Sequence, residues 1–494
     1  MFCEREVSLK GLLLLFLHKD WDKILSLSLS LSLSLCVRLC CWLLSKRRKR
    51  SIVAMAWSIK VRVSRIPKLG SFLVILLALI MATETMEMVG AITNAGDIQA
   101  LKQILMAVNV ASIKPSSCLG SWNFSMDPCD TRSTSHFTCG IDCSPGNIEE
   151  GERRITGLQL ERGAAYEGTL SPHIGDLTAL QRVIISGNSF HGLVPASLAQ
   201  LKELVHLDLS SNLFSGSLPE SLGLLQNLNF FSVAYNSLVG QIPKSFNNMM
   251  SIVYMYLNNN QLSGNLPELS ELKRLQYLDV SNNRLSGSLP AQFPPMLELL
   301  SLGKNQLSGD LPVGMKSLSF LQVLDLRSNS LTGSLEALIY ELSSLQQLNL
   351  AHNQFTSLGR TTVSGTSSSS KLISLNVSFN SLQGAIPESV TRLPKLTVLA
   401  LQSNLLTGPI PHNLALKAAN LLSGTEQLRQ LYLENNYLTG DIPWPFFSLS
   451  ADTNIAYLGM NCFKSCPPSF FFCQRDTQRS ETECHNGLKT SLLI

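Results

Sequence analysis

Leucine and other apolar residues recur along the middle of the chain with a period of about 24 residues. A representative unit is LKELVHLDLSSNLFSGSLPESLGL, from Leu201 to Leu224, and the shared pattern is LxxLxxLxLxxNxLxGxLP. The asparagine of this pattern stands at Asn188, Asn212, Asn236, Asn260, Asn283, Asn305, Asn329, Asn353, Asn380, Asn404 and Asn436. Degenerate units flank this array at Ile155–Pro172 and around Leu458–Asn461. The sequence therefore predicts eleven clear structural repeats, and up to thirteen with the flanking units.

Each position of the repeat has a physical reason. The apolar residues five and three places before the asparagine, such as Leu207 and Leu209, lie two apart and so point to the same side of a short strand. The asparagine amide can bind backbone groups that neighbouring coils would leave unpaired, and the glycine permits a tight bend. No coil can bury its leucines alone, so the coils must stack. The pattern predicts an α/β-type solenoid whose strands form a parallel sheet.

The first 91 residues are expected to lie outside the folded mature protein. We interpret 55–91 as a secretory signal peptide, because a basic stretch from Met55 precedes the apolar run Phe72–Met81. Residues 1–54 contain a Leu-Ser alternation that a CT dinucleotide repeat would encode, so we interpret them as untranslated leader; the alternative is a membrane anchor over 24–44. No later stretch offers about 20 consecutive apolar residues, so no carboxy-terminal span is expected.

Charge is distributed unevenly along the chain. Residues 1–90 hold 14 Lys and Arg against 6 Asp and Glu, which leaves 25 against 29 for the remainder of the 494 residues. The expected mature protein is therefore slightly acidic, near −4. This balance disfavours nucleic acid as a partner.

Eight cysteines beyond the first segment form two clusters at opposite ends of the repeats. They are Cys118, Cys129, Cys139 and Cys143, and then Cys462, Cys466, Cys473 and Cys484. Behind a signal peptide such clusters predict disulfides, with three pairings possible in each cluster. A zinc site built from Cys129, His136, Cys139 and Cys143 is the alternative, which the irregular spacing and the secretory context disfavour.

The two cysteine clusters lie where a solenoid needs lids over its end coils. We expect an N-terminal cap over 92–154, the solenoid over 155–461, and a C-terminal cap and tail over 462–494. In the first cap, Ala95–Ala107 reads as a helix with one face formed by Ile98, Leu101, Ile104 and Leu105. Trp122 is expected to cover the first coil.

The repeat and caps resemble the plant-specific class of extracellular leucine-rich-repeat proteins, over roughly residues 95–484. The resemblance rests on the GxLP ending after LxxLxLxxNxL, on SSCLGSWNFSMDPC with FTCGIDC, and on CFKSCPPSFFFCQRDTQRSETEC. That class includes polygalacturonase inhibitors and the ectodomains of receptor-like proteins and receptor kinases. The resemblance implies a right-handed superhelix with a concave parallel sheet, located in the apoplast or cell wall, that binds another macromolecule.

The candidate ligand-binding residues flank the strand leucines on the concave face, where core packing does not dictate their identity. They are His206, Asp208, Phe230, Tyr235, Tyr254, Tyr256, Tyr277, Asp279, Asp325 and Arg327. Aromatic residues flanked by charges are typical of binding hot spots, although tyrosine also favours strands for structural reasons. Two longer repeats contain Thr361–Lys371 and His412–Gln427, which we interpret as tolerated surface loops.

Two sequons, at Asn123 and Asn376, predict N-glycosylation of a secreted chain. A glycan on Asn376 would block part of the concave face and direct a protein ligand to the earlier, aromatic-rich repeats. The sequence contains no GxxxxGK[ST], HExxH or GxSxG motif, and it indicates neither a cofactor nor an enzyme.

The expected function is recognition. We expect a secreted protein whose concave face binds a protein, a microbial enzyme or a cell-wall polysaccharide in plant defence or development. The alternative is a membrane-tethered receptor-like protein that acts with a receptor kinase partner. The two differ in whether the segment 24–44 belongs to the mature chain.

Overall fold

A computed structural model describes residues 92–130, 136–145, 152–359, 370–452, 454–474 and 477–490. All described residues belong to one compact unit, Gly90–Ile494. The predicted leader and signal peptide therefore lie outside the described residues. Among the described residues, no helix is both long enough and apolar enough to cross a membrane.

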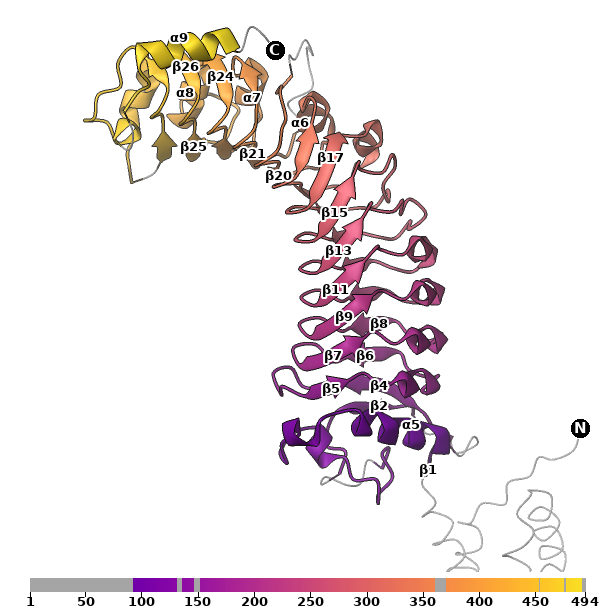
Figure 1. The fold of residues 1–494 in the computed structure, drawn as a ribbon. Helices are drawn as coiled ribbons and strands as arrows, with labels where there is room; N and C mark the ends of the chain where they lie inside the picture. Colours follow the sequence, from indigo (N-terminus) through magenta and orange to yellow (C-terminus); the bar gives the residue numbers. More distant parts are fainter. Residues whose placement is uncertain are drawn as a thin grey trace, which may run out of the picture. The chain divides into compact units, whose positions relative to one another are not determined.

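The main sheet has 14 strands, and it confirms the predicted solenoid. Thirteen strands from β4 to β27 are parallel, and β2 is antiparallel at the N-terminal edge. Figure 1 shows these coils stacked one after another from the N-terminal to the C-terminal cap. The strands are β2 (Ile141–Cys143), β4 (Ile155–Gln159), β6 (Arg182–Ile184), β8 (His206–Asp208), β10 (Phe230–Ser232), β12 (Tyr254–Tyr256), β14 (Tyr277–Asp279), β16 (Leu299–Ser301), β18 (Val323–Asp325), β20 (Gln347–Asn349), β21 (Ser374–Asn376), β23 (Val398–Ala400), β25 (Gln430–Tyr432) and β27 (Ile455–Tyr457).

A second layer of strands follows the asparagine in most coils and forms two further sheets. The eight-stranded sheet contains β5 (Glu167–Thr169), β7 (Ser189–Leu193), β9 (Leu213–Ser217), β11 (Ser237–Gly240), β13 (Gln261–Gly264), β15 (Arg284–Gly287), β17 (Gln306–Asp310) and β19 (Ser330–Thr332). The four-stranded sheet contains β22 (Gln383–Gly384), β24 (Leu405–Gly408), β26 (Tyr437–Gly440) and β28 (Cys462–Phe463). Between them lies the coil of Asn353, which lacks the GxLP ending.

Short helices complete the coils. The 3₁₀ helices are η3 (Pro172–Asp176), η4 (Ala196–Gln200), η5 (Glu220–Leu224), η6 (Lys244–Asn248), η7 (Val313–Ser317) and η9 (Trp444–Ser448). The α-helices are α6 (Glu336–Glu341), α7 (Glu388–Thr391) and α8 (His412–Ala418). Each lies between the second strand layer and the next strand of the main sheet.

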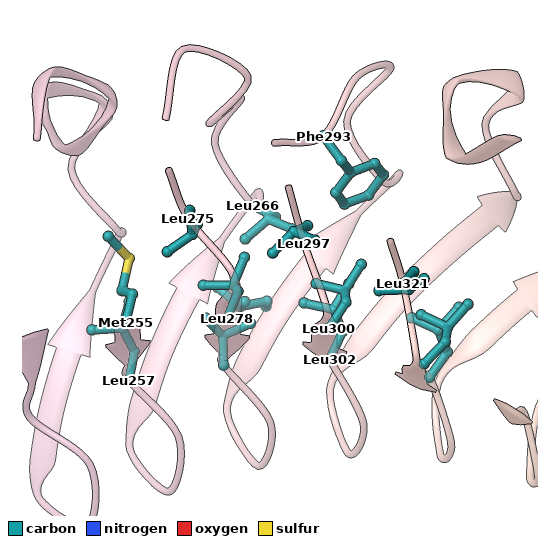
Figure 2. Close-up of a cluster of buried hydrophobic side chains, with 14 of the residues drawn as sticks. Met255, Leu257, Leu266, Leu275, Leu278, Phe293, Leu297, Leu300, Leu302 and Leu321 are labelled. Atoms are coloured by element: carbon teal, nitrogen blue, oxygen red, sulfur yellow. The ribbon is translucent and has the colours of Figure 1, made fainter. Parts of the chain in front are cut away.

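The core lies between the main sheet and these outer segments. In Figure 2 Met255 and Leu257, and two coils later Leu300 and Leu302, point into the same interior, and all four are fully buried. The predicted inward orientation of the strand leucines is therefore confirmed. Because adjacent coils share this interior, the apolar contacts run without a break from one coil to the next.

The repeat asparagines, one in each coil, form a ladder of amide groups along the interior of the solenoid. Asn260 accepts a hydrogen bond from the backbone N–H of Leu238 at 3.0 Å and donates to the carbonyls of Val233 at 2.9 Å and Leu257 at 3.1 Å. Asn461 in the last coil makes the same three kinds of contact. The asparagine thus binds both its own coil and the one before, as its position in the repeat predicted.

The N-terminal cap packs helix α5 (Ala95–Met106) onto the first coil. The cap also contains β1 (Ile92–Thr93), β3 (Glu152–Arg153), η1 (Val110–Ser112) and η2 (Leu119–Ser121). Disulfides join Cys118 to Cys139 and Cys129 to Cys143. Trp122 is buried in the core at this end and donates from Nε1 to the Cys139 carbonyl at 3.1 Å, as expected of a lid residue.

The buried face of α5 differs from the one that the sequence predicted. Leu101 and Ile104 are buried, but Ile98 is only half-buried, and Asp97 is 1% exposed. Asp97 is stable there because its carboxylate accepts two hydrogen bonds from Arg154 and one from the Ile155 backbone N–H, all at 2.9 Å. An apolar periodicity cannot show this, since the partner cation lies 57 residues away in the sequence.

The C-terminal cap is joined by the disulfides Cys462–Cys484 and Cys466–Cys473. It contains η10 (Phe471–Cys473) and α9 (Glu481–Thr490). Arg479 fixes it to the last coils, because its Nε donates to the carbonyls of Asn436 and Met460 and its guanidinium lies 4.5 Å from the Tyr437 ring centre. The prediction of disulfide-bonded caps at both ends is therefore confirmed.

One of the two longer repeats differs in part from the predicted loop. Of Thr361–Lys371, residues 361–369 lie outside the described residues. The segment His412–Gln427 begins with helix α8 instead of an open loop, and Lys417 on this helix is fully buried. Its Nζ donates to the Leu393 carbonyl at 2.9 Å, and burial lowers the pKa of Lys417 to about 8. The first part of this segment is therefore packed into the solenoid, whereas Asn420, Leu421 and Glu426 in its second part are exposed, as the predicted surface loop requires.

We expect Lys417→Met to raise the free energy of unfolding at pH 7 by about 2 kcal/mol, because the removal of a buried charge outweighs the loss of one hydrogen bond. Since the pKa of Lys417 falls from 10.5 to about 8 on folding, only the unfolded chain keeps this proton between those pH values. The contribution of Lys417 to the stability of the wild-type chain therefore rises as the pH increases from about 8 to 10.5. The advantage of the methionine variant should shrink there and then reverse, which urea denaturation from pH 7 to 11 would measure.

The matched control is Lys202→Met. Lys202 also donates to a backbone carbonyl, that of Ala199 at 2.7 Å, but its side chain is exposed. This control should change the free energy of unfolding by less than about 0.5 kcal/mol at every pH. A Lys417→Met variant that is less stable than the wild-type chain at pH 7 would contradict the prediction.

Candidate ligand-binding surface

Four rings stand side by side on the concave face, by which we mean the solvent-facing side of the 14-stranded sheet. His206, Phe230, Tyr254 and Tyr277 occupy the same register position on β8, β10, β12 and β14. All four are half-buried. We call them the aromatic row. They are brought together because every strand is parallel and in register, so equivalent repeat positions become neighbours.

Within the aromatic row the rings stack on one another. The His206 and Phe230 ring centres are 4.2 Å apart with their planes at 2°, and those of Tyr254 and Tyr277 are 4.9 Å apart at 17°. Phe230 and Tyr254 connect the two stacked pairs at 6.0 Å. Stacked rings cover the flat faces of their neighbours, so the row presents mainly ring edges and tyrosine hydroxyls to a ligand.

A second row lies two residues further along the same strands. It consists of Asp208, Ser232, Tyr256 and Asp279. The Tyr256 ring lies 5.7 Å from Phe230, and Ser232 is 5% exposed. Asp208 and Asp279 each accept a hydrogen bond from a backbone N–H two residues on, that of Ser210 at 3.0 Å and that of Ser281 at 2.9 Å. Two carboxylates therefore bracket the aromatic cluster.

The environment of the sheet shifts the pKa of three of these side chains. Burial, together with the nearby Arg182, lowers the pKa of His206, although Asp208 opposes this shift. Burial raises the pKa of Tyr256, and the hydrogen bond from the Tyr277 hydroxyl to Glu298 at 3.1 Å raises that of Tyr277. The surface thus combines neutral aromatic edges with two carboxylates.

Three of the predicted binding residues lie apart from this cluster. Tyr235 follows β10 in a left-handed backbone conformation, with φ of 56°, and its side chain is 58% exposed. Asp325 lies on β18, two strands beyond β14, and forms an ion pair of 3.4 Å with Arg327. Burial raises the pKa of Asp325, and the neighbouring Arg327 opposes this shift. These residues do not form one site with the aromatic row.

The structure also adds residues that the sequence reading missed. Arg182 precedes His206 at the same register position on β6, and its Nη2 lies 3.0 Å from Asp142. Glu298 extends the surface beyond Tyr277 and also accepts from Gln322 at 3.2 Å. Applying the repeat alignment to the repeat of Asn188 would have found Arg182. Glu298 required the tertiary structure, because it lies just before its strand.

The two predicted glycosylation sites occupy different environments. Asn123 is exposed in the N-terminal cap. Asn376 lies on β21 in the same register row as Asp279, four strands further on, and its Oδ1 accepts from the Ser378 hydroxyl at 2.7 Å. A glycan there would stand on the concave face beyond the aromatic cluster. Both sites remain predictions.

The zinc alternative lacks the ligands that it needs. Cys129, Cys139 and Cys143 are all joined in disulfides, so they offer no thiolate. Among the described residues, one group of three possible ligands comes within metal-binding distance, namely Cys118, Cys139 and Glu161. Its two cysteines form a disulfide with each other.

Comparisons with known proteins agree with this architecture. The family described as "Leucine rich repeat" matches residues 295–355, and a second description of the same name matches 203–225, 274–296, 371–393 and 427–449. No curated protein sequence matches the chain.

Solved structures with this fold include three plant receptor complexes. The chain is similar to PEPR1 bound to AtPEP1, with 28% identity and a TM-score of 0.64 over 78% of this chain and 51% of that one. It is similar to the ectodomain of the Arabidopsis thaliana receptor kinase GASSHO1/SCHENGEN3 in complex with CASPARIAN STRIP INTEGRITY FACTOR 2, with 28% identity and a TM-score of 0.65 over 74% and 44%. The ectodomain of the Arabidopsis receptor kinase HAESA with an extended IDA peptide hormone gives 26% identity and a TM-score of 0.51 over 74% and 65%.

This chain spans about half of the length of the first two of these structures. The stacked parallel strands, the asparagine ladder, the paired cysteines at both ends and the matched repeats all agree. The chain contains leucine-rich repeats, and its solenoid is like those of plant receptor ectodomains.

Proposed function

We propose that this chain is an extracellular recognition protein that binds a protein or peptide ligand on the aromatic row of its concave face, in plant defence or development. The observation that carries the proposal is the cluster of His206, Phe230, Tyr254 and Tyr277 in register on adjacent strands. Half-buried aromatic side chains on a rigid sheet supply contact area at a low cost in conformational entropy. The complexes of similar receptors with peptide ligands support the same class of ligand.

The ring geometry favours a protein ligand over a cell-wall polysaccharide. A sugar ring lies flat against an aromatic face, but the stacked pairs His206–Phe230 and Tyr254–Tyr277 turn these faces toward each other. Ring edges and hydroxyl groups instead suit contacts with side chains and backbone amides. A microbial wall-degrading enzyme, which this chain would inhibit on binding, is one protein ligand that fits this proposal.

The test removes the rings and leaves the fold. Replacing Tyr254, Tyr256 and Tyr277 together with alanine should reduce affinity for the ligand at least about 100-fold, because hot-spot residues each contribute about 2 kcal/mol. The melting temperature should change little, since the rings lie outside the core. Ligands are captured from extracellular fluid on immobilised protein, identified by mass spectrometry, and titrated against each variant.

The matched control replaces Tyr432 and Tyr457 with alanine. These residues occupy the second row on β25 and β27, on the same sheet but far along the solenoid. The control should bind as the wild-type chain does. Equal binding by the triple variant, or an equal loss in the control, would place the binding surface elsewhere.

Secretion and tethering make different predictions for the same sample. We propose a secreted chain that begins near residue 92 after removal of a signal peptide, and the paired cysteines support an oxidising compartment. The alternative retains the apolar run at 24–44 and requires a receptor kinase partner for signalling. N-terminal sequencing and intact mass, from extracellular fluid and from membranes, would distinguish them and would also report glycans on Asn123 and Asn376.

A further inference from the structure

The concave face carries an uneven charge distribution around the aromatic row. In the four coil segments 205–211, 229–235, 253–259 and 276–282, which include β8, β10, β12 and β14, the only Asp, Glu, Lys or Arg residues are Asp208 and Asp279. Both are half-buried, and neither forms an ion pair within the part of the chain that the structure describes. This contrasts with Asp325, whose charge Arg327 already balances.

Among the described residues, the cations on or just after the neighbouring strands, Arg182 and Lys304, do not form ion pairs with Asp208 or Asp279. Arg182, one strand before Asp208, is held by Asp142 at 3.0 Å. Lys304 lies in the turn after β16, one strand beyond Asp279, in a left-handed backbone conformation with φ of 55°, and its charge acts on Asp325. The two carboxylates therefore leave a negative potential at both ends of a neutral aromatic surface.

Their spacing matches an extended peptide. Asp208 and Asp279 lie at the same register position three strands apart. Adjacent strands are about 4.8 Å apart, so the separation is about 14 Å, which an extended chain covers in about four residues. In an extended chain, residues i, i+2 and i+4 point to the same side. A residue midway between the carboxylates then faces Phe230, Tyr254 and Tyr256.

We propose that the concave face binds an extended peptide segment in which two basic residues, four positions apart, pair with Asp208 and Asp279 while an apolar residue between them lies on the aromatic cluster. This proposal rests on the proposed function and specifies the ligand that the surface selects. The aliphatic stems of lysine or arginine would lie along the ring edges, and their charged ends would reach the carboxylates. The arrangement is symmetric, so it permits either direction of the peptide.

The test uses an array of nine-residue synthetic peptides with leucine at the centre. Lysine or arginine is placed at positions ±1, ±2 or ±3 from the leucine, glutamate replaces it at ±2 in one set, and glycine and serine fill the other positions. The purified full-length mature protein should bind the ±2 basic peptides about five-fold more strongly than the ±1 and ±3 sets for each charge pair. Glutamate at ±2 should abolish binding.

Two conservative variants assign the contacts. Asp208→Asn and Asp279→Asn should each remove one of the two charge pairs, with a loss of about five-fold in affinity for the ±2 basic peptides. The matched control is Asp441→Asn, because Asp441 is 78% exposed beside Lys464 at the far end of the solenoid. It should leave the array pattern unchanged.

The remaining outcomes separate the inference from the proposed function. Peptides that bind through Tyr254 and Tyr277 with no preference for basic flanks would overturn the inference and leave the proposed function intact. The inference would also be overturned, and the proposed function left intact, if Asp208→Asn and Asp279→Asn both kept the full preference for basic residues at ±2. Binding of oligogalacturonate or xyloglucan fragments by the aromatic row, with no peptide bound, would overturn both.

Discussion

Replacing Asn260 with alanine is expected to destabilise the solenoid by about 4 kcal/mol. The change leaves the Leu238 N–H without its acceptor and the carbonyls of Val233 and Leu257 without a donor, all inside the protein. Each unsatisfied buried group costs about 1–3 kcal/mol. Asn260→Asp should be no better at neutral pH, since a carboxylate cannot donate to the two carbonyls.

Urea denaturation of the purified chain, followed by circular dichroism, would measure this effect. The matched control is Asn227→Ala, because Asn227 also donates to a backbone carbonyl, that of Lys202 at 2.9 Å, but is exposed to solvent. That control should cost less than about 1 kcal/mol. A loss of under 1 kcal/mol in Asn260→Ala would show that the amide ladder contributes little to the stacking of coils.

Removing the Asp97 carboxylate should have a comparable effect at the N-terminal cap. Asp97→Ala is expected to cost about 3–5 kcal/mol, because it leaves Arg154 without its buried partner and the Ile155 N–H without an acceptor. The loss should be local at first, since a solenoid coil contacts only its neighbours. Hydrogen exchange should therefore show early opening of α5 and β4 before the central coils unfold.

A double-mutant cycle isolates the ion pair. Arg154→Met combined with Asp97→Ala removes both charges, so the double variant should be more stable than the sum of the two single losses by about 1.5–3 kcal/mol. Additive losses would mean that Asp97 acts only through the Ile155 backbone and not through Arg154. Asp176→Ala serves as the surface control, because its pair with His173 is more than half exposed.

The candidate surface was only partly predictable from the sequence. The repeat alignment placed His206, Tyr254 and Tyr277 at outward positions, and the structure puts them in register. It could not show that the rings stack face to face, because stacking depends on side-chain rotamers and on the twist between strands. That geometry is what favours a peptide over a sugar.

Charge pairing shows the same limit. In sequence, Asp208, Asp279 and Asp325 are equivalent aspartates at one repeat position. Only the tertiary structure shows that Arg327 pairs with Asp325 while the other two bracket the aromatic cluster. The pairing arises because the residue two places on is Arg327 after Asp325 but serine after Asp208 and Asp279, and the folded coil brings the arginine back to the carboxylate.

The sequence by itself determined the solenoid, the number of its coils and the positions that face inward, because these follow from a short-range period that every coil repeats. The tertiary structure decided the disulfide pairing, the burial of Asp97 and Lys417, and which outward residues form one surface. These depend on contacts between segments that lie far apart in the chain, and on the desolvation of individual charges, neither of which a local pattern encodes.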